Sequence, residues 1–176
     1  VTMNTKAIQS AIDHLSKVGG GTLIIPKGCF LTGSIELKSN INLYLEKDAV
    51  LLGSTQYADY RKLTDHQSLI LASDQSHISI TGEGTIDGQG RAFALKLDSL
   101  FFVGKMNQED YDLTRPDERV RPTDLQIVNC KDVTVKQVTF KNAACWVQQY
   151  IGCENVIIDK IRVDSNQLFF CIIKVV

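Results

Sequence analysis

Four acidic side chains are the first candidates for chemistry in this sequence. Asp117 and Glu118 are adjacent, and two neighbouring carboxyl groups can divide the roles of general acid and general base. Glu83 and Asp87 each lie beside glycine, where an acidic side chain commonly hydrogen-bonds to the backbone of a turn. We interpret Glu83 and Asp87 as turn residues, and we expect Asp117 and Glu118 to be solvated loop charges rather than a catalytic pair.

Arg121 and Trp146 are candidates for binding. A guanidinium pairs well with carboxylates, so Arg121 can bind an acidic ligand, although a structural ion pair is at least as consistent with its position. The indole of Trp146 can stack on a sugar ring. The alternative, which we favour, is a large side chain that fills the core beside Cys145.

The cysteines argue against a metal centre. None of the five belongs to a Cys-x-x-Cys pair, so we predict no zinc site. An odd number in a domain of this size also argues against a dense disulfide framework. Free cysteine is among the most buried residue types, so we expect most of them to be buried free thiols. They are Cys29, Cys130, Cys145, Cys153 and Cys171.

The bulk composition is that of one ordinary globular domain. Hydrophobic residues make up 44% and charged residues 22% of the 176 positions. The net charge of -1 indicates no general attraction to nucleic acid. No apolar run approaches the roughly 18 residues of a membrane span, and no signal peptide is visible.

One helix is predicted, over residues 5–18. Asn4 or Thr5 can cap it, apolar residues recur at helical spacing from Ala7 to Leu15, and Gly19–Gly21 ends it. From residue 22 to residue 168 we expect short strands and no second helix of comparable quality. Period-two alternation indicates strands at 22–25, 34–37, 41–45 and 48–52.

An internal repeat organises the rest of the chain. Cys130-Lys131-Asp132-Val133 aligns with Cys153-Glu154-Asn155-Val156, 23 positions later. Each repeat holds two or three tiny strands, as at 133–135 and 138–140, and residues 77–80 begin an equivalent pattern. This length suits one turn of a β-solenoid. The leucine-rich repeat has a similar length, but its L-x-x-L-x-L-x-x-N spacing is absent.

The repeat predicts one partial solenoid domain over residues 1–176. First turns would occupy 22–87 and regular turns 122–168, with the helix covering the first turn. Residues 88–121 break the period with glycine, proline and many charges, so we expect a long loop or irregular turn there. Cys130 and Cys153 should stack one turn apart as free thiols, although that spacing permits a disulfide. Asn40, Asn129, Asn142 and Asn155 fall near turns.

Several segments resemble glycoside hydrolase family 28, the polygalacturonases and their relatives. They include the helix segment 4–21, the stretches 30–40, 43–46 and 49–54, Gly82 to Gly90 (GEGTIDGQG), Arg121-Pro122, and Cys145 to Tyr150 (CWVQQY). The resemblance implies a right-handed parallel β-helix, here of about six turns. It also implies inverting hydrolysis of the glycosidic bonds of galacturonan or rhamnogalacturonan, which requires two carboxyl groups about 6.5–9.5 Å apart.

The catalytic motifs of that family are absent from this sequence. It has no Asp-Asp pair, no histidine after a glycine and no Arg-x-Lys. Residues 163–169 resemble the approach to the first catalytic motif, but an aberrant apolar tail, 170–176, follows in place of Asn-Asn-Asp-Gly. We therefore expect an N-terminal portion of a polygalacturonase-like enzyme that has no catalytic residues of its own and is inactive alone.

The resemblance also implies a site, a partner and a location. Gln149 matches a position that faces the substrate groove, so Gln149, Arg121 and Trp146 are the predicted substrate-binding residues for a pectic oligo- or polysaccharide. No cofactor, metal, nucleic acid or membrane partner is expected, and the family is extracellular or periplasmic. An open last turn predicts self-association. The alternatives are a non-catalytic carbohydrate-binding or structural β-helix and a polysaccharide lyase of the same fold.

Overall fold

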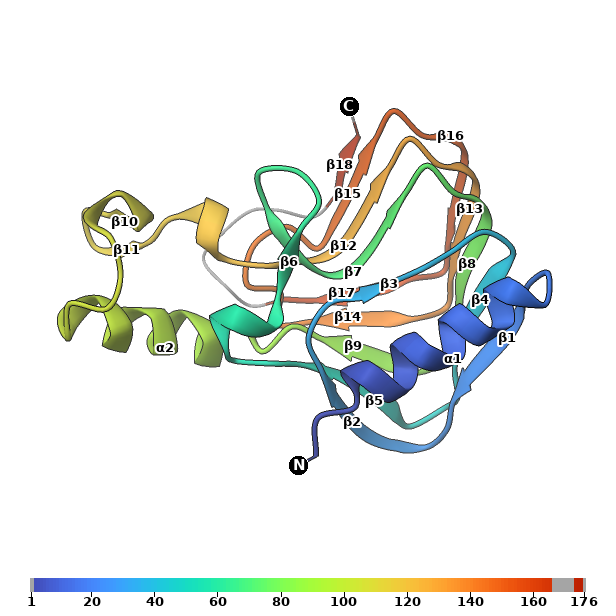
Figure 1. Ribbon diagram of the computed structural model, residues 1–176, viewed down its shortest axis with the longest axis horizontal. Helices are drawn as coiled ribbons and strands as arrows, with labels where there is room; N and C mark the ends of the chain where they lie inside the picture. Colours follow the sequence, from blue (N-terminus) through green and yellow to red (C-terminus); the bar gives the residue numbers. More distant parts are fainter. Residues whose placement is uncertain (1, 166–172, 176) are drawn as a thin grey trace.

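The computed structural model describes residues 2–165 and the backbone of residues 173–175. Three parallel sheets make up most of it (Figure 1). The first sheet contains β1 (Gly21–Ile25), β4 (Ile41–Leu45), β8 (Ser76–Gly82), β13 (Lys131–Lys136) and β16 (Glu154–Asp159). The second contains β2 (Gly28–Thr32), β5 (Ala49–Gly53), β9 (Thr85–Asp87), β14 (Thr139–Lys141) and β17 (Arg162–Asp164). The third contains β3 (Ile35–Glu36), β7 (Gln67–Ser73), β12 (Thr123–Val128), β15 (Gln148–Ile151) and β18 (Ile173–Val175), and β6 (Arg61–Lys62) pairs antiparallel with β7.

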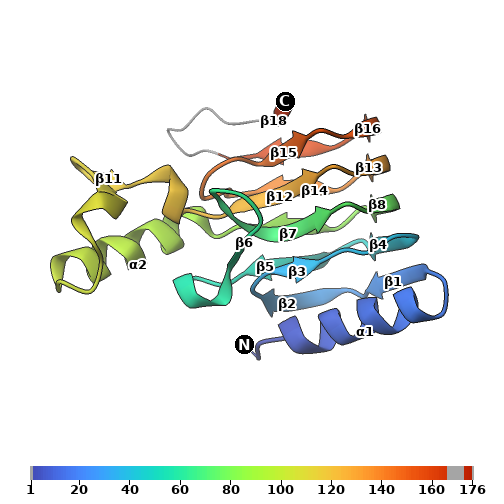
Figure 2. The same ribbon diagram turned by 45° about the horizontal axis from the view of Figure 1, so that its top comes forward.

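The chain visits the three sheets in turn and climbs by one strand in each, which is a parallel β-helix (Figure 2). The described residues make five turns, not the six expected, because each turn contributes one strand to the 5-stranded first sheet. The 23-residue repeat is confirmed, since Lys131 pairs with Glu154 and Val133 with Val156. The equivalence of the segment at 77–80 is also confirmed, because Val133 pairs with Ile78 on its other side.

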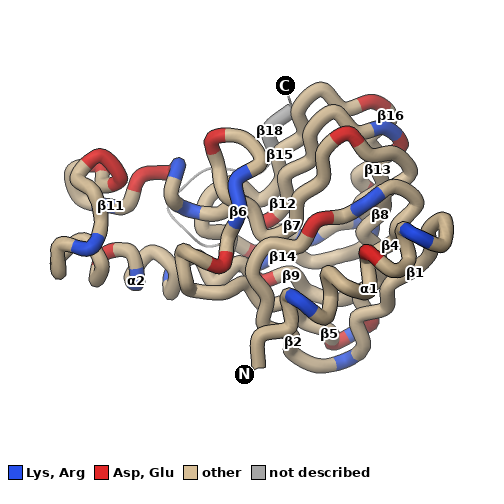
Figure 3. Tube along the Cα trace, viewed as in Figure 1, with Lys and Arg blue, Asp and Glu red and all other residues tan. Residues whose placement is uncertain are grey.

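Stacked apolar side chains form the core inside this coil. Along the second sheet, Leu51 pairs with Ile86, and Ile86 pairs with Phe140. All three are fully buried, at 0% exposure. Outside the coil, charges of opposite sign stack instead, as in the Lys131–Glu154 pair at 3.0 Å, and both signs are interspersed along the chain (Figure 3). The alternation of strand residues therefore sets one row inside and the next outside.

Asparagine residues make the corners between strands, as predicted. Asn40, Asn129, Asn142 and Asn155 all have positive φ, between 50° and 62°. Asparagine tolerates this left-handed conformation better than most residues. The side chains also bond to the turn below, as when Asn155 Nδ2 donates to Asp132 Oδ1 at 3.0 Å. These residues are therefore architectural.

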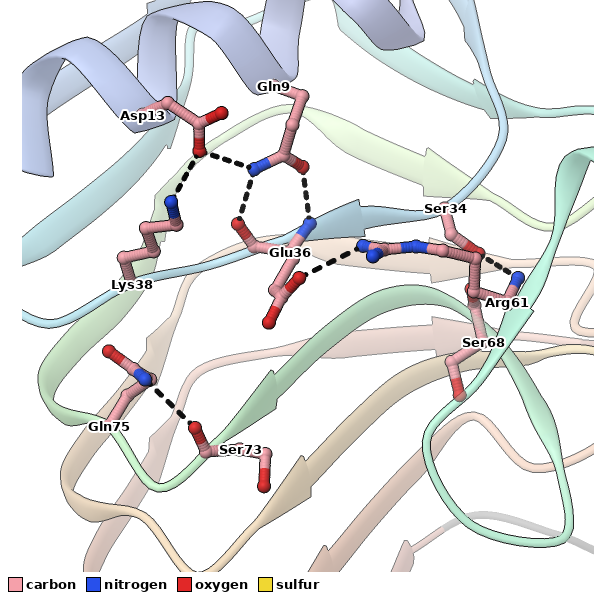
Figure 4. Close-up of polar contacts among 9 residues, drawn as sticks. All are labelled: Gln9, Asp13, Ser34, Glu36, Lys38, Arg61, Ser68, Ser73 and Gln75. Carbon is pink, nitrogen blue, oxygen red and sulfur yellow. Dashed lines mark hydrogen bonds and ion pairs between the residues drawn. The ribbon is translucent and has the colours of Figure 1, made fainter.

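The predicted N-terminal helix is α1 (Thr5–Lys17), which lies beside the first turn in Figure 2. It buries Ile8 and Ile12. Gln9 docks the helix onto β3, because its side chain donates to Glu36 O at 3.1 Å and accepts from Glu36 N at 2.8 Å (Figure 4). The expected side-chain cap is absent: Asn4 occupies the N-cap but turns its amide to Thr2 O and Leu31 O.

The prediction of a loop without a second helix over 88–121 is wrong. This segment contains α2 (Gly90–Phe102), and it also holds η2 (Gln108–Asp110), the β10 (Tyr111–Asp112)–β11 (Arg115–Pro116) hairpin and η3 (Glu118–Val120). A further short helix, η1 (Tyr57–Asp59), precedes β6. The α2 pattern was hidden because only Phe93 and Leu97 among its large apolar side chains are buried, whereas Leu95 and Phe102 are exposed. In Figure 1 this lobe projects from the sheets.

The tail expected to be aberrant continues the fold in part. β18 pairs in parallel with β15, and Gln149 lies opposite Lys174. The remainder of the tail at 170–172 and 176 lies outside the described residues. Neither α1 nor α2, the two longest helices of the described chain, is long and apolar enough to cross a membrane.

Truncating the stacked core should destabilise the coil strongly. Ile86→Ala should lower the free energy of unfolding by about 2–5 kcal/mol, because it leaves a cavity between Leu51 and Phe140. Ile157→Ala is the matched control, since Ile157 is 54% exposed and should change it by less than about 0.5 kcal/mol. Urea unfolding followed by circular dichroism measures both, and equal losses would contradict the assignment of the inner row.

Candidate functional site

A row of hydrogen-bonded polar side chains crosses the third sheet from one turn to the next. Gln126 pairs with Gln149 in register, and Gln126 Nε2 donates to Gln149 Oε1 at 2.5 Å. Gln126 Nε2 also donates to Thr64 Oγ1 at 2.7 Å, and Ser68 Oγ donates to Gln126 Oε1 at 3.2 Å. Ser68, Gln126 and Gln149 are buried. The register of β12 with β15 and the approach of Thr64 and Ser68 thus build a polar row that periodicity alone did not reveal.

The other two predicted binding residues lie at the corner where the chain enters the third sheet. Arg121 comes just before β12, and Trp146 just before β15. Arg121 is only 5% exposed, and its Nη1 donates to Ala144 O at 2.6 Å. Trp146 is half-buried, and its backbone oxygen accepts from Asp124 N at 3.0 Å. Arg121 and Trp146 thus lie just before the N-terminal ends of β12 and β15, Gln149 lies within β15, and Trp146 is the most exposed of the three.

Arg121 also lines a small cavity at this corner, next to α2. The cavity has a volume of about 40 Å³ and is shared by Arg115, Gly90 and Ala143. This is room for ordered water rather than for a sugar ring. Arg121 therefore holds the backbone of this corner through the Ala144 carbonyl, and Arg115 lines the same small cavity.

Two carboxyl groups meet behind this corner, a pair that the sequence analysis missed. A Cβ built on Gly88 would lie 2.3 Å from Asp124 Oδ1, so glycine is needed where the end of β9 approaches β12. Asp87 accepts from Gln89 N at 2.9 Å and from Asn142 Nδ2 at 3.1 Å, which confirms its interpretation as a turn residue. Asp87 ends β9 and Asp124 lies in β12 of the same turn, and the 88–121 insertion leaves and rejoins the coil at the corner between them.

Burial favours the protonated form of Asp124. It is 1% exposed, and its Oδ2 has no hydrogen-bond partner among the described side chains and backbone. Desolvation raises the pKa of Asp124 well above its ordinary value, and the nearby charge of Asp87 raises it further. Burial of Tyr60 raises the pKa of its own hydroxyl, and the nearby carboxyl of Asp124 raises it further. The enclosed carboxyl of Asp124 is poorly placed to activate water.

The adjacent acids Asp117 and Glu118 lie at η3 (Glu118–Val120). Asp117 is the N-cap of η3 and accepts from both Arg119 N at 2.9 Å and Arg119 Nε at 2.7 Å. The hydrogen bond from the Arg119 side chain lowers the pKa of Asp117. Glu118 is exposed. The expectation that these are ordinary loop charges is consistent with this geometry.

The described cysteines are free thiols. Cys130 and Cys145 are buried as expected, whereas Cys153 is half-buried and Cys29 is exposed. Cys171 lies outside the described residues. Burial raises the pKa of the Cys130 thiol, and Cys130 and Cys153 both donate to backbone carbonyls of the third sheet. Their stacking is structural.

Comparison with known proteins decides the family. The model for glycosyl hydrolases family 28 matches residues 16–167. The chain belongs to this family. It is 30% identical over 180 residues to a probable polygalacturonase from Vitis vinifera, covering 92% of this chain and 34% of the relative. It is 27% identical over 167 residues to an exopolygalacturonase from Zea mays, covering 93% of this chain and 37% of the relative.

Solved structures agree with the family assignment. A putative glycosyl hydrolase from Parabacteroides merdae superposes with a TM-score of 0.87 at 34% identity, covering 98% of this chain and 73% of that one. An exopolygalacturonase from Thermotoga maritima superposes with a TM-score of 0.71 at 27% identity, covering 93% of this chain and 44% of that one. This family 28 chain thus has the parallel β-helix fold of its relatives and spans about a third of the length of the curated ones it matches.

Neutralising Asp124 by substitution should remove a pH dependence of stability. The unfolded chain loses this proton above about pH 4, whereas the native state retains it, so stability falls as pH rises from there toward the raised native pKa. The free energy of unfolding of Asp124→Asn should therefore change less with pH over that window than that of the parent. Asp65→Asn, an exposed control, should keep the parent slope. Urea unfolding across a pH series tests this, and parallel curves for parent and Asp124→Asn would contradict it.

Proposed function

We propose that this chain is a substrate-binding portion of a polygalacturonase-type glycosidase that acts on pectic polysaccharide by inverting hydrolysis. The observation that carries the proposal is the family match over residues 16–167. The polar row of the third sheet and Trp146, just before β15, add to it. The substrate is a polyanion of uronic acids, which a guanidinium such as Arg121 complements. With its relatives, we place the protein outside the cytoplasm.

The binding face would use Trp146, Arg121 and Gln149 in different ways. Trp146 is half-buried and is the aromatic side chain on which a sugar ring would stack. Arg121 holds the Ala144 carbonyl and supplies positive charge behind that surface. Gln149 orients the neighbouring turn through Gln126. Arg121 and Gln149 would therefore act mainly by positioning the edge that Trp146 presents.

Hydrolysis by the chain alone is not expected. An inverting enzyme needs two carboxyl groups about 6.5–9.5 Å apart with room for a water between them. The sequence contains no Asp-Asp pair, and of the two carboxyl groups that do approach, Asp124 is enclosed and burial raises its pKa. The chain should thus bind polygalacturonate without cleaving it. Reducing-sugar release that a point change within residues 2–165 abolishes would overturn this.

Binding should depend on Trp146. Trp146→Ala should weaken the retardation of the chain in gels containing polygalacturonate, with a Kd about 2- to 10-fold higher, because the stacking surface is lost. Phe102→Ala is the matched control, since Phe102 is 77% exposed but lies in the α2 lobe. Dextran gels test for nonspecific retardation. Equal retardation of all three proteins by polygalacturonate would remove Trp146 from the site.

A second function, adhesion without catalysis, is favoured by one structural relative. PfbA, a surface adhesin of Streptococcus pneumoniae, superposes with a TM-score of 0.66 at 26% identity over 93% of this chain. The surrounding reading frame in the genome separates the two proposals. Downstream Asn-x-Asp and Asp-Asp motifs support the glycosidase, and a long solenoid without them supports an adhesin.

The last turn would also mediate self-association. Within the described residues, β16, β17 and β18 each pair on one side only. Open strand edges recruit other strands. The 176-residue chain should therefore sediment as species heavier than 19.6 kDa, increasingly so at higher concentration. A concentration-independent monomer in analytical ultracentrifugation would contradict this.

A further inference from the structure

A second recessed surface lies on the side of the second sheet, away from the polar row. It is a cavity of about 450 Å³ between α2 and the ends of β5, β9 and β14. Its lining includes none of Arg121, Trp146 and Gln149. The volume exceeds what a few waters need and suits a small ligand.

One wall of the cavity offers hydrogen-bonding groups in fixed positions. Asn142 Nδ2 lies 3.1 Å from both carboxylate oxygens of Asp87, and Gln89 N lies 2.9 Å from Oδ1. A carboxylate has about four acceptor positions, so Asp87 retains capacity for ligand hydroxyls. Gln89 donates its Nε2 to Gly53 O at 2.5 Å, which leaves its Oε1 as an acceptor. These groups are held before any ligand arrives.

The other walls are aliphatic and cationic. Leu52 and Leu95 line the cavity, and Leu95 is 56% exposed. Their side chains can pack against the carbon–hydrogen face of a pyranose ring. Arg91, from the first turn of α2, also lines the cavity, is exposed, and forms no ion pair within the described part of the chain. Among the described residues that line the cavity, Arg91 and Asp87 are therefore the charged ones, one of each sign.

We infer that this cavity binds an acidic monosaccharide unit, a pyranose ring that carries one carboxylate. Arg91 pairs with the ligand carboxylate, Asp87 and Gln89 accept from ring hydroxyls, and Leu52 and Leu95 contact the ring face. A single guanidinium balances a single carboxylate. A phosphate dianion would bring a second negative charge toward Asp87, which disfavours sugar phosphates. The choice of galacturonate as probe rests on the proposed function, but the chemistry of the cavity does not.

The test is a titration of ¹⁵N-labelled chain with sodium D-galacturonate, followed by amide chemical shifts. Saturable shifts are expected at residues 89–95 and at Leu52 and Asn142. D-Galactose has the same ring without the carboxylate and should bind at least about tenfold more weakly. Arg91→Gln should weaken galacturonate binding about tenfold and leave galactose binding unchanged.

Lys96→Gln is the matched control, because it removes the same charge from an exposed position of α2 that does not line the cavity. It should bind galacturonate like the parent. The inference is overturned by unperturbed amides around Arg91, by equal affinities for galacturonate and galactose, or by equal losses in Arg91→Gln and Lys96→Gln. Shifts around Trp146 report on the proposed function separately, so either site can fail while the other stands.

Discussion

The whole molecule depends on parallel backbone pairing of each strand with its counterpart one turn away. Because the turns stack at about 4.8 Å, a residue type at one position meets the residue at the equivalent position of the next turn. Inside, this produces the Leu51–Ile86–Phe140 column. Outside, it produces pairs such as Lys131 with Glu154. A slip of one residue would exchange the two faces, so burial of the inner rows holds the register.

The same register repeats the corners between strands from turn to turn. Asparagine with positive φ turns the chain at successive levels, and its side chain bonds to an acidic residue one turn below. The amide row of Gln126 and Gln149 follows the same logic on the third sheet. Buried side chains such as Gln126 and Gln149 are tolerated in this row because they hydrogen-bond to each other from paired positions of adjacent strands.

The insertion at residues 88–121 interrupts the regular coil with a helical lobe. It leaves the second sheet after β9 and rejoins the third sheet at β12, so α2 lies over the corner between them. The same corner holds the Asp87–Asp124 approach, the small cavity at Arg121 and the larger one at Arg91. A regular turn would close this corner with a few residues. A helix there creates recessed surfaces on either side of it.

Periodicity by itself determined that this is a solenoid, because a 23-residue offset between Cys130 and Cys153 permits stacked turns and little else. It also located the N-terminal helix and the asparagine corners, since these depend on residues close together in the chain. It did not find α2, whose exposed Leu95 and Phe102 blur the helical pattern. Nor did it bring Asp124 to Asp87 or Gln126 to Gln149, or show that Arg121 and Gln149 are buried. Those outcomes depend on which strands become neighbours, on where the 88–121 insertion rejoins the coil and on how closely the chain packs. The folded structure alone sets the burial of a residue and its distance from residues remote in sequence. The raised pKa of Asp124 therefore follows from the tertiary structure.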